Sequence, residues 1–157
     1  MSVMAAFTFT TEWQFDSPLE LVCDAIIQCQ SWPQWWPGAE RVEKLVAGDA
    51  DGIGSVHHFT WKGKIPYRFS FTLRVTRYIP GIMLEGVAEG DVTGTGRWNF
   101  MRANNITIVH YTWTVSTNRL WMNLLALIAK PIFKWNHDQV MRQGEQGLTH
   151  WLRIQYR

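Results

Sequence analysis

Two adjacent histidines, His57 and His58, are the first residues in this chain whose chemistry suggests a function. An imidazole titrates near neutral pH, so a histidine in a pocket can accept or donate a proton. The surrounding GSVHHFTWKG is typical of a strand, in which neighbouring side chains point to opposite faces. The pair therefore does not predict a metal site, and only His57 shares a face with Phe59 and Trp61. We interpret His57 either as a neutral core imidazole or as a catalytic acid/base group.

No further catalytic or metal-binding motif accompanies these histidines. The sequence has no G-x-S-x-G elbow, phosphate-binding glycine loop, H-E-x-x-H pair or Cys/His ligand set. Cys23 and Cys29 do not have the spacing of a zinc site, and we expect reduced thiols. The net charge is only +2 and the basic residues are scattered, which argues against a nucleic-acid partner. We predict no metal and no cofactor.

A single amide interrupts the apolar stripe of a helix expected in the last forty residues. Asn136 follows Phe133 and precedes Val140 on that stripe. A buried amide is costly unless a hydrogen-bond partner satisfies it. The partner can be a ligand, the backbone of a sheet or an indole N–H. Pro131 either starts this helix or kinks a longer one begun near Leu120.

Three tryptophans and two prolines occupy the eight residues SWPQWWPG at positions 31–38. The prolines place them on a connector that follows a helix expected at about 18–28. An indole combines a large apolar surface with a polar N–H group. The connector, including Trp36, is therefore predicted to roof a cavity as a mobile lid or a static plug.

Between positions 39 and 116 the chain alternates strands with Gly-, Pro- or Asn-containing turns, which predicts an antiparallel meander. In YRFSFTLRV and TIVHYTWTV, apolar and polar residues alternate, so one face is buried and aromatic and the other is wet. The glycines of LEGVAEGDVTGTGRW either bend the sheet or leave empty volume for a ligand; they are Gly86, Gly90, Gly94 and Gly96.

The composition fits one globular domain over positions 1–157, with 46% hydrophobic and 18% charged residues. The longest apolar run, LLALIA, is too short to cross a bilayer, so no integral membrane segment is predicted. MSVMAAFTFTTEW lacks the features of an export signal, so we expect a cytoplasmic location. A sheet with one apolar face needs a cover, and the C-terminal helix is the long amphipathic element available.

The order of these segments resembles the START-like (SRPBCC) superfamily, and most of all its polyketide cyclase/dehydrase and lipid-transport branch. The matching segments are SPLELVCDAI, WPQWWPG, GDADGIGS, IPYRFSFTLRV, IPGIMLEGVAEGDVTGTGRW, ITIVHYTWTV and NHDQVMRQGEQGL. The resemblance implies an α+β helix-grip fold, in which a curved antiparallel β-sheet wraps around a long C-terminal α-helix and two short helices close one end. It also implies a deep apolar cavity that holds a lipid, a polyketide or another aromatic molecule.

Three functions follow as hypotheses. The first is a carrier or sensor of a hydrophobic small molecule, and the second is a cyclase or dehydratase that uses His57 for proton transfer. The third is a chaperone-like or assembly role of an exposed aromatic patch on the connector. The residues predicted to bind the ligand are Trp36, Phe59, Trp61, Phe69, Phe71, Trp98, Tyr111, Trp113, Asn136 and Val140.

Overall fold

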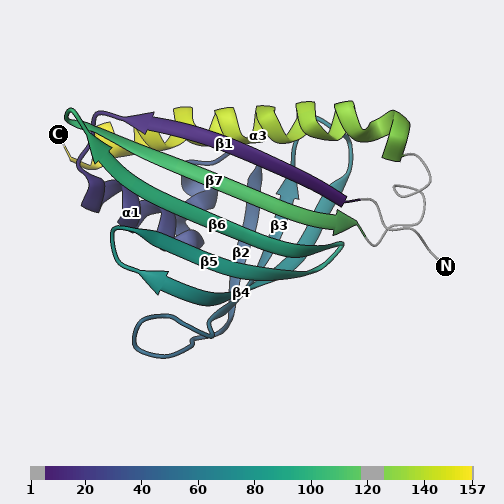
Figure 1. The fold of residues 1–157 in the computed structure, drawn as a ribbon, viewed down its shortest axis with the longest axis horizontal. Helices are drawn as coiled ribbons and strands as arrows, with labels where there is room; N and C mark the ends of the chain where they lie inside the picture. Colours follow the sequence, from purple (N-terminus) through teal and green to yellow (C-terminus); the bar gives the residue numbers. More distant parts are fainter. Residues whose placement is uncertain (1–5, 118–125, 157) are drawn as a thin grey trace.

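The computed structural model describes residues 6–117 and 126–156, in which seven antiparallel strands form one sheet. The strand order is β1-β7-β6-β5-β4-β3-β2, so every neighbouring pair but β1 and β7 is consecutive in the chain. Figure 1 shows the long helix α3 lying along β1 and β7, while the sheet curves away from it. The strands are β1 (Ala6–Phe15), β2 (Ala39–Val46), β3 (Val56–Lys62), β4 (Arg68–Ile79), β5 (Met83–Gly90), β6 (Val92–Ala103) and β7 (Ile106–Thr117). This curved sheet around a C-terminal helix confirms the predicted architecture.

The helices lie close to their predicted positions. Helix α1 spans Leu19–Ile27, and Pro18 occupies its N-cap, where it can make no side-chain hydrogen bond. A 3₁₀ helix, η1, follows at Cys29–Gln34. Helix α3 spans Ala126–Gln155 and contains Pro131, so this proline does not start the helix. The expected start near Leu120 lies outside the described residues.

Glycine allows two strands to approach and bend in the β5–β6 region. Gly94 has a φ of +152°, and a Cβ atom built there would overlap the Thr114 carbonyl oxygen on β7. Gly86 and Gly96 face each other across β5 and β6 and both line a cavity, but a Cβ atom there would lie 3.1 Å from Leu73 or 3.0 Å from Trp113. Close approach of neighbouring groups therefore favours glycine at all three positions.

The tryptophan connector is packed against the rest of the core. Trp36 is only 1% exposed, and its indole Nε1 donates a hydrogen bond of 2.8 Å to the Val140 carbonyl oxygen of α3. Its ring lies 5.1 Å from the Trp13 ring and 4.9 Å from the Trp61 ring. A Cβ atom on Gly144 of α3 would come within 2.6 Å of the Trp36 ring, so the helix and the connector are in direct contact. Trp36 is therefore buried between the sheet and α3.

Candidate functional site

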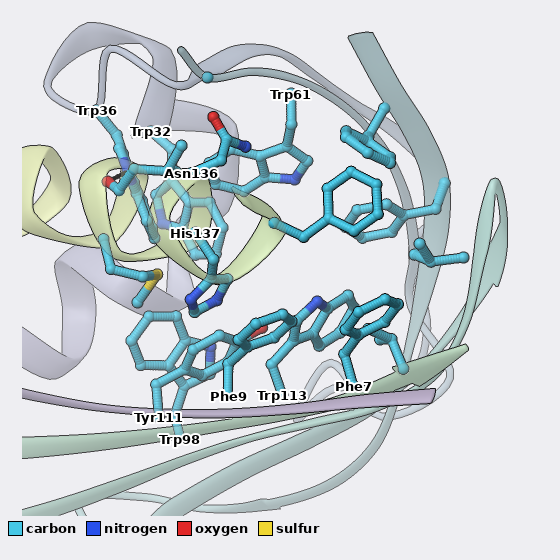
Figure 2. A pocket seen from close by; sticks show the side chains of 18 residues that line it. Phe7, Phe9, Trp32, Trp36, Trp61, Trp98, Tyr111, Trp113, Asn136 and His137 are labelled. Carbon is cyan, nitrogen blue, oxygen red and sulfur yellow. Dashed lines mark hydrogen bonds between the residues drawn. The ribbon is translucent and has the colours of Figure 1, made fainter. Parts of the chain in front are cut away.

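A cavity of about 160 Å³, which we call the aromatic chamber, lies between the sheet and the first half of α3. Its strand residues are those that alternation turns inward from β1, β3, β4, β6 and β7. Figure 2 shows the rings of β1, β6 and β7 on one side of the chamber, and Trp61 and Asn136 on the other. An apolar cavity of about 150 Å³ in another protein stays dry and binds benzene. The aromatic chamber in this conformation is therefore the size of one aromatic ring. Its lining is Phe7, Phe9, Trp32, Trp36, Trp61, Gly63, Phe69, Phe71, Val92, Trp98, Tyr111, Trp113, Val115, Phe133, Asn136, His137, Val140 and Met141.

Asn136 ties α3 to the loop between β3 and β4. Its Oδ1 accepts hydrogen bonds from the backbone N–H groups of Lys64, at 2.7 Å, and Ile65, at 3.1 Å. The predicted partners were a ligand, the backbone of the sheet or an indole N–H; the partners in the structure are backbone groups of the β3–β4 loop. Asn136 also lines the aromatic chamber, so it holds one edge of the cavity in place.

Two polar groups in the wall of the aromatic chamber are buried without a partner. Neither Trp61 Nε1 nor His137 Nδ1 has a hydrogen-bond partner within residues 6–117 and 126–156. Buried polar atoms in proteins are nearly always hydrogen-bonded, and an unpaired one costs about 1–3 kcal/mol. A ligand oxygen in the chamber would satisfy such a group.

His137 is held in its neutral form by its surroundings. Its ring stacks on Phe9, with the ring centres 4.4 Å apart and the planes 16° from parallel. Burial is the largest cause that lowers its pKa, to about 4; Asp138 raises that pKa and Lys134 lowers it further. Near neutral pH the side chain is an uncharged imidazole that can accept or donate one hydrogen bond.

A second chamber of about 400 Å³ lies between α1, η1 and strands β2 to β7. Three side chains, Trp32, Trp98 and Tyr111, line both chambers. The Trp98 and Tyr111 rings are stacked with centres 4.1 Å apart. Burial raises the pKa of Tyr111, so its hydroxyl stays protonated. These three rings form the partition between the two chambers.

The predicted ligand residues separate between these chambers. Those found in the aromatic chamber are Trp36, Trp61, Phe69, Phe71, Trp98, Tyr111, Trp113, Asn136 and Val140. Phe59 and the catalytic candidate His57 line the second chamber instead. His58 points to the opposite face of the strand from His57. Its Nε2 atom lies 2.6 Å from the hydroxyl oxygen of Ser70.

Several residues of the aromatic chamber were not among the predicted ligand residues, including Phe133, His137 and Met141. Phe133 lies on the predicted apolar stripe of the helix but was not assigned to the ligand. The predicted stripe does not include His137 and Met141, although positions 133, 136, 137, 140 and 141 follow the three- and four-residue spacing of one helix face.

The cysteines are poor nucleophiles, and no metal centre is present in the described part of the chain. Burial raises the pKa of Cys23 to about 12 and that of Cys29 to about 11, so both thiols stay protonated. Residues 6–117 and 126–156 contain no group of three or more His, Cys, Asp or Glu side chains that could hold a metal ion. Among the same residues, no helix is long and apolar enough to span a membrane.

Similarity to known proteins is visible in structure alone. No protein-family model matches the chain, and no curated protein matches it in sequence. The Zhui aromatase/cyclase from a Streptomyces species is similar with a TM-score of 0.78 and 13% identity, over 98% of this chain and 97% of that one. A START superfamily protein from Mycobacterium smegmatis has a TM-score of 0.74 and 11% identity, over 94% and 97% of the two chains.

The di-domain aromatase/cyclase BexL from the BE-7585A biosynthetic pathway is similar with a TM-score of 0.71 and 16% identity. The match covers 92% of this chain and 49% of that protein, which is one half of a two-domain chain. Together with the strand order and the position of α3, these likenesses show that the chain has the START-like helix-grip fold.

Proposed function

We propose that this protein binds a small, largely apolar aromatic molecule in the aromatic chamber and acts as its carrier or sensor. One observation supports the proposal above the others. The chamber is enclosed almost entirely by aromatic and aliphatic side chains, yet Trp61 Nε1 and His137 Nδ1 are buried in its wall without partners. A ligand with an apolar ring and one oxygen substituent complements both properties.

The size of the chamber limits what it binds in this conformation. A ring that buries about 150 Å² of apolar surface gains about 4 kcal/mol, which corresponds to a dissociation constant near 1 mM. One hydrogen bond to a buried polar group strengthens binding by about tenfold. A molecule with several fused rings requires the wall to move, because the cavity of about 160 Å³ holds one ring.

The experiment compares phenol with toluene, which differ by a hydroxyl in place of a methyl group. In a purely apolar cavity toluene binds more tightly, because the phenol hydroxyl loses its hydrogen bonds to water. A hydrogen bond to Trp61 or His137 reverses or removes that preference. Tryptophan fluorescence and thermal denaturation measure both affinities, and a ligand at one hundred times its dissociation constant raises Tm by roughly 5–10 °C.

Single variants identify the group that is used. Trp61→Phe removes the indole N–H, and His137→Phe removes the imidazole, while both keep a ring in place. One of them is expected to weaken phenol binding by about tenfold and leave toluene binding unchanged. Trp135→Phe is the matched control, because Trp135 is exposed on α3 and does not line the chamber. Absence of binding by both compounds contradicts the proposal.

A cyclase or dehydratase is the second candidate, and the position of His137 favours it. A neutral imidazole in the aromatic chamber can accept a proton from an activated carbon or hydroxyl of a bound polyketide-like substrate. His57 is less well placed for that reaction, since it lines the other chamber. If this candidate is correct, His137→Gln keeps substrate binding and loses about a hundredfold in turnover. The chaperone hypothesis has less support, because Trp32, Trp35 and Trp36 are all buried.

A further inference from the structure

The second chamber has a volume within the range of small-molecule sites and is larger than the aromatic chamber. Its lining includes Gly86 of β5 and Gly96 of β6, which are direct cross-strand partners. The apolar walls come from α1, β4 and β5, and they include Ile26, Leu73 and Leu84. The chamber therefore lies over the β5–β6 part of the sheet.

One corner of the second chamber carries positive charge. Lys44 of β2 and His57 of β3 are cross-strand partners, and both line the chamber. Neither side chain has an ion-pair or hydrogen-bond partner among the described residues. Burial lowers the pKa of His57 and Lys44 lowers it further, and Lys44 also lowers the pKa of the Cys29 thiol against the effect of burial. The Lys44 ammonium therefore acts on both neighbouring groups.

The acidic residues of the chamber lie elsewhere. Glu85 accepts a hydrogen bond of 2.7 Å from Arg97 Nε on the neighbouring strand, so its charge is balanced. Asp51 acts on Tyr78, whose pKa is raised mainly by burial and further by Cys23, Asp24 and Asp51. Neither Asp51 nor Glu85 contributes to the pKa shift of His57. The chamber is thus polarised, with the unpaired Lys44 ammonium and the neutral His57 imidazole at the edge formed by β2 and β3.

We propose that the second chamber is a separate binding site for a small organic acid, with the carboxylate between Lys44 and His57 and the hydrocarbon against Ile26, Leu73 and Leu84. A carboxylate accepts hydrogen bonds from both groups and offsets the charge of Lys44. This proposal does not depend on a ligand in the aromatic chamber.

The bound acid also makes binding dependent on pH. A carboxylate beside His57 stabilises the protonated imidazole, so binding takes up a proton, and affinity rises as the pH falls below neutrality toward the lowered pKa of the free imidazole. The charged and titratable groups around His57 are Lys44 from β2 and Cys29 from η1, with Tyr78, Asp51 and Glu85 farther along the chamber wall. His57→Gln is expected to remove most of this pH dependence while the site still binds.

The test measures binding of octanoate and of its neutral analogue octanamide by calorimetry. Octanoate is expected to bind more tightly than octanamide. Lys44→Met is expected to weaken the binding of octanoate by about tenfold and to leave the affinity for octanamide unchanged. Lys44→Arg keeps the charge and is expected to retain octanoate binding. Lys62→Met is the control, because it removes the same charge from β3 at an exposed residue that lines neither chamber.

Three results would overturn the proposal. The first is equal affinity for octanoate and octanamide, or binding of neither at millimolar concentration. The second is an equal loss of octanoate affinity in Lys44→Met and Lys62→Met. The third is nuclear Overhauser contacts from octanoate to the methyl groups of Val115 and Val140, in the aromatic chamber, with none to Ile26, Leu73 or Leu84. Phenol binding, measured separately, tests the aromatic chamber and not this site.

Discussion

Replacing Trp36 by alanine tests whether the tryptophan connector is a permanent part of the core. Trp36 is 1% exposed and packs against the indoles of Trp13, Trp32 and Trp61. Truncation of a buried tryptophan costs about 3–5 kcal/mol, and loss of its hydrogen bond to the Val140 carbonyl adds up to about 1 kcal/mol. We expect Trp36→Ala to lower the free energy of unfolding by about 4–5 kcal/mol.

The assay is urea denaturation followed by circular dichroism, with thermal denaturation beside it. A loss of about 4–5 kcal/mol corresponds to a fall in Tm of roughly 8–20 °C in a chain of this size. Trp135→Ala on α3 is the control, because it makes the same chemical deletion at a side chain that is 51% exposed. We expect Trp135→Ala to lower the free energy of unfolding by less than about 1 kcal/mol.

A lid would behave differently from a plug. A lid residue loses part of its burial whenever the cavity opens, so its truncation alters ligand affinity or release more than stability. If Trp36→Ala and Trp135→Ala destabilise the protein equally, the packing argument fails and the connector is a lid. A large loss of stability confined to Trp36→Ala supports the plug.

Three further predictions concern α3. Because the folded-state pKa of His137 lies below its ordinary value, the unfolded chain binds the proton first, and stability falls as the pH drops from about 6.5 to about 4; His137→Phe is expected to remove that part of the pH profile in urea titrations. Asn136→Ala is expected to lower the free energy of unfolding, measured by denaturant titration, by about 1–3 kcal/mol, because two backbone N–H groups of the β3–β4 loop lose their acceptor. Gly144→Ala is expected to destabilise the protein by up to about 2 kcal/mol net, because contact of the new methyl group with Trp13 and Trp36 costs about 1–3 kcal/mol and the helix propensity gain offsets about 1 kcal/mol of it; a rise in Tm would contradict this close packing.

Strand alternation accounts for most of what the sequence predicted about the aromatic chamber. A one-residue shift in register moves every side chain of a strand to the other face, so the apolar positions of YRFSFTLRV and TIVHYTWTV define which residues face inward. Phe69, Phe71, Tyr111 and Trp113 all face the chamber for that reason. Asn136 was likewise identified from its place on the helix stripe.

The division of the interior into two chambers was beyond such reasoning. Phe59 and Trp61 share a strand face, yet Phe59 lines the second chamber and Trp61 the aromatic one. Trp32, from η1, packs against both rings, with ring centres 5.4 Å from Phe59 and 6.0 Å from Trp61, and it lines both chambers. Periodicity predicts which face a residue occupies, but the packing of a distant ring decides which cavity it borders.

Nuclear Overhauser contacts between a bound ring and assigned methyl groups test the central claim most directly. With phenol in solution, we predict contacts from its ring protons to the methyl groups of Val92, Val115, Val140 and Met141, which line the aromatic chamber. The methyl groups of Ile26, Leu73, Val75 and Leu84, which line the second chamber, provide the internal comparison. Contacts confined to the second group, or no contacts at saturating phenol, would contradict the claim that the aromatic chamber is the binding site.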